Sequence, residues 1–305
     1  MPSFLSLCGF WKKRKGHDIE ANVSQGLQLP TWITEAKIVK KQDSFLQFLG
    51  KYKEQNWFQI PHFMTRKGRF HEPIFLKGSC SSENVAASLV DSASLDESKI
   101  LKNISEKIKP CLNGRCIYLV GMMGSGKTTL GKILSEALGF SFYDCDALIE
   151  QAFGGSTVAE IFKSYGEGFF RDNETEILQK LSSMHRLVVS TGGGAVVRPI
   201  NWRHMQKGIT VWLDVPLEAL ATRLTAIGTD SRPLLHNESG DPYSKTLKRL
   251  STIFKERVEA YANADARVSL QNIASKLGIE DVCDVAPTTI AIEVLLQIEN
   301  FLKIR

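Results

Sequence analysis

The chain has 305 residues, which allows one large domain or two small ones, and its 43% hydrophobic content is ordinary for a globular protein. No stretch approaches the roughly 18 uncharged apolar residues of a membrane span, which excludes a transmembrane helix. The net charge of +5 is uneven, because residues 1–109 hold 17 of the 38 Lys and Arg but 11 of the 33 Asp and Glu. The remainder is nearly neutral, so we do not expect it to bind nucleic acid.

Cysteine usage points to a reducing compartment. The six cysteines form no C-x-x-C pair and no cluster with histidine. They stand at positions 8, 80, 111, 116, 145 and 283. A structural zinc site and a disulfide scaffold are therefore both disfavoured.

Residues 1–78 show no clean hydrophobic period and are basic. An apolar run over 4–11 precedes the basic run 12–15, which is the reverse of the order in a secretory signal. Six acidic residues and few serines make the segment a partial match to an organelle transit peptide. We predict a poorly structured leader that targets the protein, with a solvated tail as the alternative.

Residues 79–98 contain seven serines and are predicted to form a flexible linker. A helix is expected over 95–109, because Ile100, Leu101, Ile104 and Ile108 lie near one face, with Pro110 as its stop. We therefore expect a single domain over residues 99–305.

Residues 121–128 match the pattern G-x-x-x-x-G-K-T. An apolar run over 116–120 predicts a strand before this loop, and apolar residues at helical spacing follow it up to Gly139. The order strand, glycine loop, helix distinguishes a phosphate-binding loop from a chance match. Lys127 would contact the β- and γ-phosphates and the Thr128 hydroxyl would hold Mg²⁺. The pattern thus predicts a nucleoside triphosphate site.

The rest of the chain alternates strands and helices. Strands are predicted over 140–145, 187–191, 210–213 and 266–270, and helices over 158–165, 173–181, 202–206, 217–224, 243–262 and 287–303. Such alternation predicts a doubly wound α/β fold, a parallel sheet with helices on both faces. No D-x-x-G or N-K-x-D motif of a GTPase follows the loop, and the size is that of a small-metabolite kinase.

Two carboxylates, Asp144 and Asp146, end the second predicted strand. Ligands of parallel α/β sheets bind beyond the carboxyl ends of the strands, and alternation along the strand would put both side chains on one side. One carboxylate can order Mg²⁺ while the other accepts a proton from an attacking hydroxyl. The alternative is that one of them caps the next helix.

Three further features could bind anions. Arg171 begins a predicted helix, where the helix dipole does not favour a cation, so a role outside the helix is plausible. It could bind an anion with two hydrogen bonds while Glu174, one turn further on, holds its side chain. The alternative is that Arg171 only forms an ion pair on the surface. Gly192–Gly194 would let a ligand approach the backbone, unless they are a loose turn. Arg232 lies in a polar stretch long enough for a mobile lid, where it could neutralise a transferring phosphoryl group. Arg257 on the long helix would by itself be solvated.

Together these motifs resemble shikimate kinase, and the plant plastid form in particular. The matching segments are GMMGSGKTT at 121–129, D-x-D at 144–146, GExxFRxxE at 166–174, GGG at 192–194, RPLL at 232–235 and RxxxY at 257–261. The resemblance covers roughly 112–303. It implies a P-loop kinase fold like that of nucleoside monophosphate kinases, and transfer of the γ-phosphoryl of MgATP to the 3-hydroxyl of shikimate in the plastid. It implies neither a nucleic acid nor a membrane partner, and no oligomeric state.

The resemblance also implies roles for individual residues. ATP would be bound by Gly121, Met122, Met123, Gly124, Ser125, Gly126, Lys127, Thr128, Thr129, Arg223 and Arg232. Shikimate would be bound by Asp146, Arg171, Gly192, Gly193, Gly194 and Arg257, with the two arginines on its carboxylate. Thr128 and Asp144 would order Mg²⁺, and the catalytic residues would be Lys127, Asp146 and Arg232. Two alternatives stay open: another small-metabolite kinase, such as a gluconate kinase, and a non-catalytic protein of the same fold.

Overall fold

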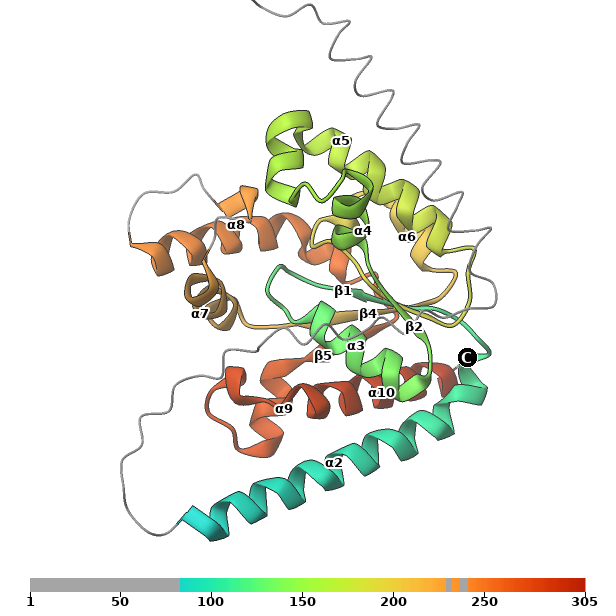
Figure 1. Cartoon of the computed structure of the whole chain (residues 1–305), viewed down its shortest axis with the longest axis vertical. Helices are drawn as coiled ribbons and strands as arrows, with labels where there is room; N and C mark the ends of the chain where they lie inside the picture. Colours follow the sequence, from blue (N-terminus) through green and yellow to red (C-terminus); the bar gives the residue numbers. More distant parts are fainter. Residues whose placement is uncertain (1–82, 229–231, 236–240, 305) are drawn as a thin grey trace, which may run out of the picture. The chain divides into compact units, whose positions relative to one another are not determined.

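The computed structural model describes residues 83–228, 232–235 and 241–304. Its centre is a parallel sheet with strand order β2-β3-β1-β4-β5 (Figure 1). The strands are β1 (Ile117–Val120), β2 (Ser141–Asp144), β3 (Leu187–Ser190), β4 (Ile209–Asp214) and β5 (Ala266–Ser269). All four strands predicted after the glycine loop and the one before it are present, which confirms the parallel α/β fold.

Helices cover both faces of the sheet, as the alternation predicted. They are α2 (Glu83–Leu112), α3 (Lys127–Leu138), α4 (Cys145–Ala152), α5 (Val158–Leu181), α6 (Pro199–Met205), α7 (Leu217–Ile227), α8 (Pro242–Tyr261), α9 (Leu270–Leu277) and α10 (Pro287–Ile304). In Figure 1, α2, α3, α9 and α10 lie on one side of the sheet, and α4, α5, α6 and α8 lie on the other. The central strands β1 and β3 are therefore buried on both faces, which suits their apolar sequences.

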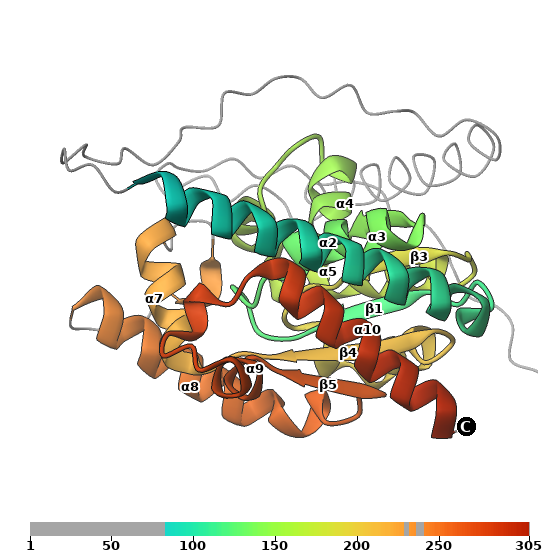
Figure 2. The same cartoon turned by 90° about the horizontal axis from the view of Figure 1, so that it is seen from below.

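Helix α2 is longer than the sequence pattern predicted. It begins at Glu83, so most of the segment expected to be a flexible linker is helical. Serine opposes a helix only weakly, and the segment also carries Glu, Ala and Leu, which favour one. Its second half buries Leu101, Ile108 and Leu112, and α2 lies beside α10 (Figure 2). The expected leader over 1–78 falls outside the described residues.

The stretch predicted as two helices is one element, α5, with a break at Gly166. This glycine has φ 83° and ψ 168°, a conformation that side-chain-bearing residues avoid. Arg171 therefore lies inside the second half of α5, and the prediction that it begins a helix is wrong. The helices α4 and α9, of eight residues each, were not predicted. Within the described ranges, none of the helices has the length and apolar character needed to cross a membrane.

Candidate active site

The loop between β1 and α3 takes its shape from glycines. Gly121, Gly124 and Gly126 have φ of 150°, 78° and 87°. A Cβ on Gly121 would lie 2.7 Å from the carbonyl oxygen of Leu213, so the loop accepts only glycine there. Gly126 caps α3 and brings no side chain to its first N–H groups. Those groups and the positive end of the helix are therefore available to a phosphate.

The ammonium group of Lys127 is held inside this loop. Its Nζ donates hydrogen bonds to the carbonyl oxygens of Gly121 and Met122 at 2.9 and 2.8 Å, and to the Ser125 hydroxyl at 3.3 Å. Burial lowers the pKa of Lys127 to about 8, while the nearby carboxylate of Asp146 opposes that shift. The loop thus keeps a cation at the point where a bound phosphate chain would lie.

Thr128, in the first turn of α3, meets Asp144 at the carboxyl end of β2. The Thr128 hydroxyl donates to Asp144 Oδ2 at 2.7 Å, and the Ser190 hydroxyl lies 3.5 Å from the Thr128 hydroxyl. Asp144 Oδ1 accepts from the backbone N–H groups of Asp146 and Ala147, so it also caps α4. One oxygen of Asp144 therefore caps α4, as the alternative interpretation predicted, while the other faces Thr128 of the glycine loop.

Asp146 also lies near the phosphate loop, but its position differs from the prediction because it belongs to a helix and not to the strand. Because β2 ends at Asp144, strand alternation does not orient Asp146, which lies in the first turn of α4. Its Oδ1 is buried and has no hydrogen-bond partner among the described residues. Burial raises the pKa of Asp146 to about 7, and the carboxylate of Glu174 adds to the rise, whereas Lys127 and Arg171 lower it.

Arg171 is buried between two carboxylates and two aromatic rings. Its Nη1 donates to Glu174 Oε2 at 2.8 Å, which was expected, and its Nε and Nη2 donate to Glu167 Oε1 at 3.3 and 3.1 Å. The guanidinium carbon lies 5.9 and 5.5 Å from the ring centroids of Phe162 and Phe170. With only 8% of the residue exposed, this is no surface ion pair. One N–H of each terminal nitrogen remains for a further partner.

The three glycines after β3 pass through the middle of this group. A Cβ on Gly192 would collide with Glu174 Oε1 and lie 2.8 Å from Asp146 Oδ1, and one on Gly194 would collide with Arg171. The turn is therefore packed rather than loose. Arg257 on α8 donates from Nη1 to the carbonyl oxygen of Gly193 at 3.0 Å. Only 6% of this residue is exposed, so the prediction from local sequence of a solvated arginine is wrong.

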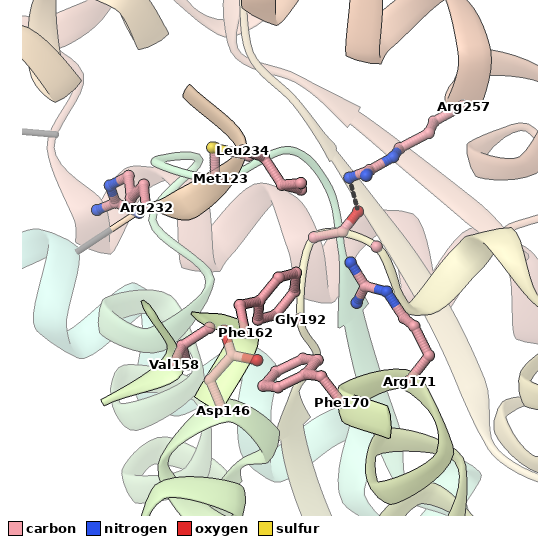
Figure 3. Close-up of a pocket in the computed structure, with 12 residues that line it drawn as sticks. Met123, Asp146, Val158, Phe162, Phe170, Arg171, Gly192, Arg232, Leu234 and Arg257 are labelled. Atoms are coloured by element: carbon pink, nitrogen blue, oxygen red, sulfur yellow. Dashed lines mark hydrogen bonds between the residues drawn. The ribbon is translucent and has the colours of Figure 1, made fainter. Parts of the chain in front are cut away.

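These side chains surround one cavity, shown in Figure 3. It is lined by Met123, Asp146, Val158, Phe162, Phe170, Arg171, Gly192, Gly193, Gly194, Arg232, Leu234 and Arg257. The guanidinium groups of Arg171 and Arg257 lie close to each other on one side, while Asp146 and Arg232 lie on the other side (Figure 3). The cavity therefore offers a strong anion site at one end and a carboxylate near the phosphate loop at the other.

Comparison with known proteins identifies the family. The sequence profile described as Shikimate kinase matches residues 123–298. The chain belongs to the shikimate kinase family. It is 61% identical to a chloroplastic shikimate kinase of Solanum lycopersicum, over 93% of this chain and 97% of that protein. It is 53% identical to chloroplastic shikimate kinase 1 of Arabidopsis thaliana, over 93% of this chain and 96% of that protein.

The same family is found among solved structures. A shikimate kinase from Acinetobacter baumannii in complex with shikimate has a TM-score of 0.53 and 32% identity, over 66% of this chain and 99% of that chain. The predicted resemblance is thus confirmed and extended, because an alignment over 93% of the chain must include most of residues 1–98. The motifs had covered only 112–303.

The two arginines that were predicted to bind ATP, Arg223 and Arg232, lie in different settings. Arg232 lines the cavity just before η2 (Pro233–Leu235), and burial lowers its pKa while Asp146 opposes that shift. Much of the expected lid, 229–231 and 236–240, falls outside the described residues. Arg223 is half-buried on α7 and lies outside the cavity lining; the next residue, Leu224, packs within 3.2 Å of a Cβ built on Gly124. Thr129 is exposed on α3.

Two residues beside the cavity, Glu167 and Tyr261, belong to the motifs but were given no role from the sequence. Glu167 holds one edge of Arg171, and its spacing of four residues on a helix would have suggested the pair. Tyr261 donates from its hydroxyl to the carbonyl oxygen of Gly193 at 2.7 Å. No local signal marks that contact, which joins residues 68 positions apart.

Proposed function

We propose that this chain transfers the γ-phosphoryl group of MgATP to the 3-hydroxyl of shikimate, giving shikimate 3-phosphate and ADP. The observation that carries the proposal is the pairing, in one cavity, of the Arg171 and Arg257 guanidiniums with a carboxylate, Asp146, beside the phosphate loop. Shikimate is a small acid with ring hydroxyls, so its carboxylate and its acceptor hydroxyl fit opposite ends of such a site.

On the acceptor side, the two arginines take the carboxylate. Arg171 is oriented by Glu167 and Glu174 and keeps two N–H groups free of them, and Arg257 adds a second guanidinium. The rings of Phe162 and Phe170 line the same space and suit the apolar face of a six-membered ring. Binding at one end in this way holds the hydroxyl at the other end in a fixed position, which is itself a large part of catalysis.

On the donor side, the loop 121–128 binds the phosphate chain through backbone N–H groups, and Lys127 and Arg232 bring positive charge to the transferring group. Little covalent chemistry is asked of the protein in phosphoryl transfer, so these charges supply much of the rate. The acceptor hydroxyl gives its proton to Asp146 or is oriented by it, and a pKa of about 7 suits a base working near neutral pH.

The residues next to the phosphate loop fit a magnesium ion. The Thr128 hydroxyl lies 2.7 Å from Asp144 Oδ2 and 3.5 Å from the Ser190 hydroxyl. These side chains offer oxygen atoms, the ligands that Mg²⁺ prefers. In the described part of the chain, no group of three or more His, Cys, Asp or Glu side chains could hold a metal alone. That suits an ion which draws its remaining ligands from phosphate and water. When bound, it would neutralise phosphate charge, held by Thr128 and Asp144.

A substrate panel tests the reaction. Full-length protein is incubated with MgATP and either shikimate or gluconate, and ADP release is measured. We expect release that depends on shikimate. ADP release with gluconate but not with shikimate would mean that the chain is a gluconate kinase. No release with either compound would favour a non-catalytic role.

We further propose that residues 1–78 act as a transit peptide that brings the kinase to the plastid. The relatives from Solanum lycopersicum and Arabidopsis thaliana are chloroplastic, and the alignments with both reach into this segment. A fluorescent fusion of residues 1–95 should enter chloroplasts. Fluorescence that stays in the cytosol would contradict the assignment.

A further inference from the structure

The carbonyl oxygen of Gly193 accepts two hydrogen bonds, and both come from α8. Tyr261 donates from its hydroxyl at 2.7 Å and Arg257 from Nη1 at 3.0 Å. A carbonyl oxygen has two lone pairs, so this acceptor is saturated. The Tyr261 side chain is fully buried, and its ring stacks on Trp212 with centroids 5.7 Å apart and planes at 14°. The hydroxyl therefore has a fixed position from which to hold the carbonyl.

Fixing that carbonyl fixes the next N–H group. The peptide between Gly193 and Gly194 is planar and trans, since the described residues contain no cis bond. Its N–H therefore points opposite to its C=O, which faces α8, and so points away from that helix. Glycines have no side chains to hold their own conformation, so an outside anchor must set this peptide.

We propose that Tyr261 is a positioning residue, whose hydroxyl holds the Gly193–Gly194 peptide so that the Gly194 N–H faces the bound acceptor. The role rests on the proposed function of the cavity. Arg257 cannot do this work alone, because the substrate carboxylate competes for its guanidinium. The Tyr261 residue lies outside the cavity lining, so a bound substrate would not compete for its hydroxyl.

The same hydroxyl also connects the acceptor loop to the phosphate loop. It lies 3.6 Å from Met122 Sδ, and a Cβ on Gly193 would be 3.3 Å from the backbone nitrogen of Met123. The two loops are thus in contact at the peptide that Tyr261 holds. Shifting this peptide would change the acceptor site first, because the phosphate loop keeps its own glycine geometry and the Lys127 contacts.

Tyr261→Phe removes only the hydroxyl and keeps the stacked ring. We expect the KM for shikimate to rise about three- to tenfold, the range for loss of one buried hydrogen bond. The dissociation constant of ADP, measured without shikimate, should stay within about twofold of the wild-type value. In ¹H–¹⁵N spectra, the shift of the Gly194 amide on adding shikimate should shrink. A purely structural role would instead weaken both ligands alike and lower the Tm.

The matched control is Tyr118→Phe, which removes another fully buried tyrosine hydroxyl, on β1 and outside the cavity lining. It should leave the KM for shikimate unchanged. An unchanged KM in Tyr261→Phe, with a wild-type protein that phosphorylates shikimate, would overturn the role of Tyr261 and leave the proposed function standing. A wild-type protein that does not use shikimate would overturn both.

Discussion

The two halves of the active site are built in different ways. The phosphate side is one continuous stretch, 121–128. Its glycines give the loop its shape, and its lysine donates hydrogen bonds to carbonyl oxygens of the same loop. The acceptor side is assembled from α4, α5, the Gly192–Gly194 turn and α8, and contacts such as Arg257 to Gly193 join residues 64 positions apart. The first half depends on local conformation and the second on the packing of the whole domain. Changes in the two halves should therefore have separable effects.

Asp146 lies where the halves meet, so its loss should have the largest effect. Asp146→Asn keeps the side-chain shape but removes the proton acceptor, and we expect kcat to fall by about 10²–10⁴. Binding of ADP should change little, because the phosphate loop is untouched. The measurements are steady-state kinetics and calorimetry. Near-normal turnover would contradict the role of this carboxylate.

Lys127→Met tests the phosphate half. Methionine fills a similar volume but removes the charge, and loss of one stabilising group at a transferring centre costs about 10²–10³ in kcat. Shikimate binding, followed by calorimetry in the absence of nucleotide, should remain close to that of the wild type. A large loss of shikimate binding would mean that the two halves are not independent.

Arg171→Lys tests the acceptor half. The charge stays, so the buried Glu174 is not left unpaired, but the planar guanidinium edge is lost. We expect the KM for shikimate to rise about 10- to 100-fold, as for loss of a charged hydrogen bond, and the KM for ATP to stay within about twofold. The matched control is Arg198→Lys. Arg198 pairs with Asp172 and lies outside the cavity lining, so this exchange should change neither KM. A selective rise in the ATP requirement of Arg171→Lys would refute the carboxylate site.

The smallest effect concerns stability and pH. The pKa of Asp146 is raised to about 7 in the folded protein, so the folded state holds its proton more tightly than the unfolded state does. This group therefore favours folding fully below its ordinary pKa near 3.8, and that contribution is lost as pH rises through about 7. Without ligands, Asp146→Asn should melt at a higher Tm than the wild type at pH 8, and the gap should shrink at pH 5. A gap that grows toward acid pH would contradict the shift.

The same contrast explains what the sequence could predict. The strand, loop and helix around 121–128 follow from local spacing, and each appears where it was expected. Arg171 and Asp146 were chosen correctly as cavity residues, but the reasons were wrong. The helix that contains Arg171 starts several positions before the predicted start, and the strand ends at Asp144, so Asp146 belongs to the next helix. Tyr261 and Glu167 lie in the motifs but were given no role. The helical spacing of Glu167 and Arg171 could have indicated their ion pair, whereas the contact of Tyr261 depends on how α8 packs against the glycine turn, which no local pattern encodes.

The identity of the phosphorylated product tests the central proposal most directly. Full-length protein, MgATP and shikimate are incubated together, and a ³¹P–¹H correlation spectrum is recorded on the product. We predict a new phosphorus signal coupled to the proton on carbon 3 of the shikimate ring. A phosphate coupled to a different ring position, or no product signal at all, would contradict it.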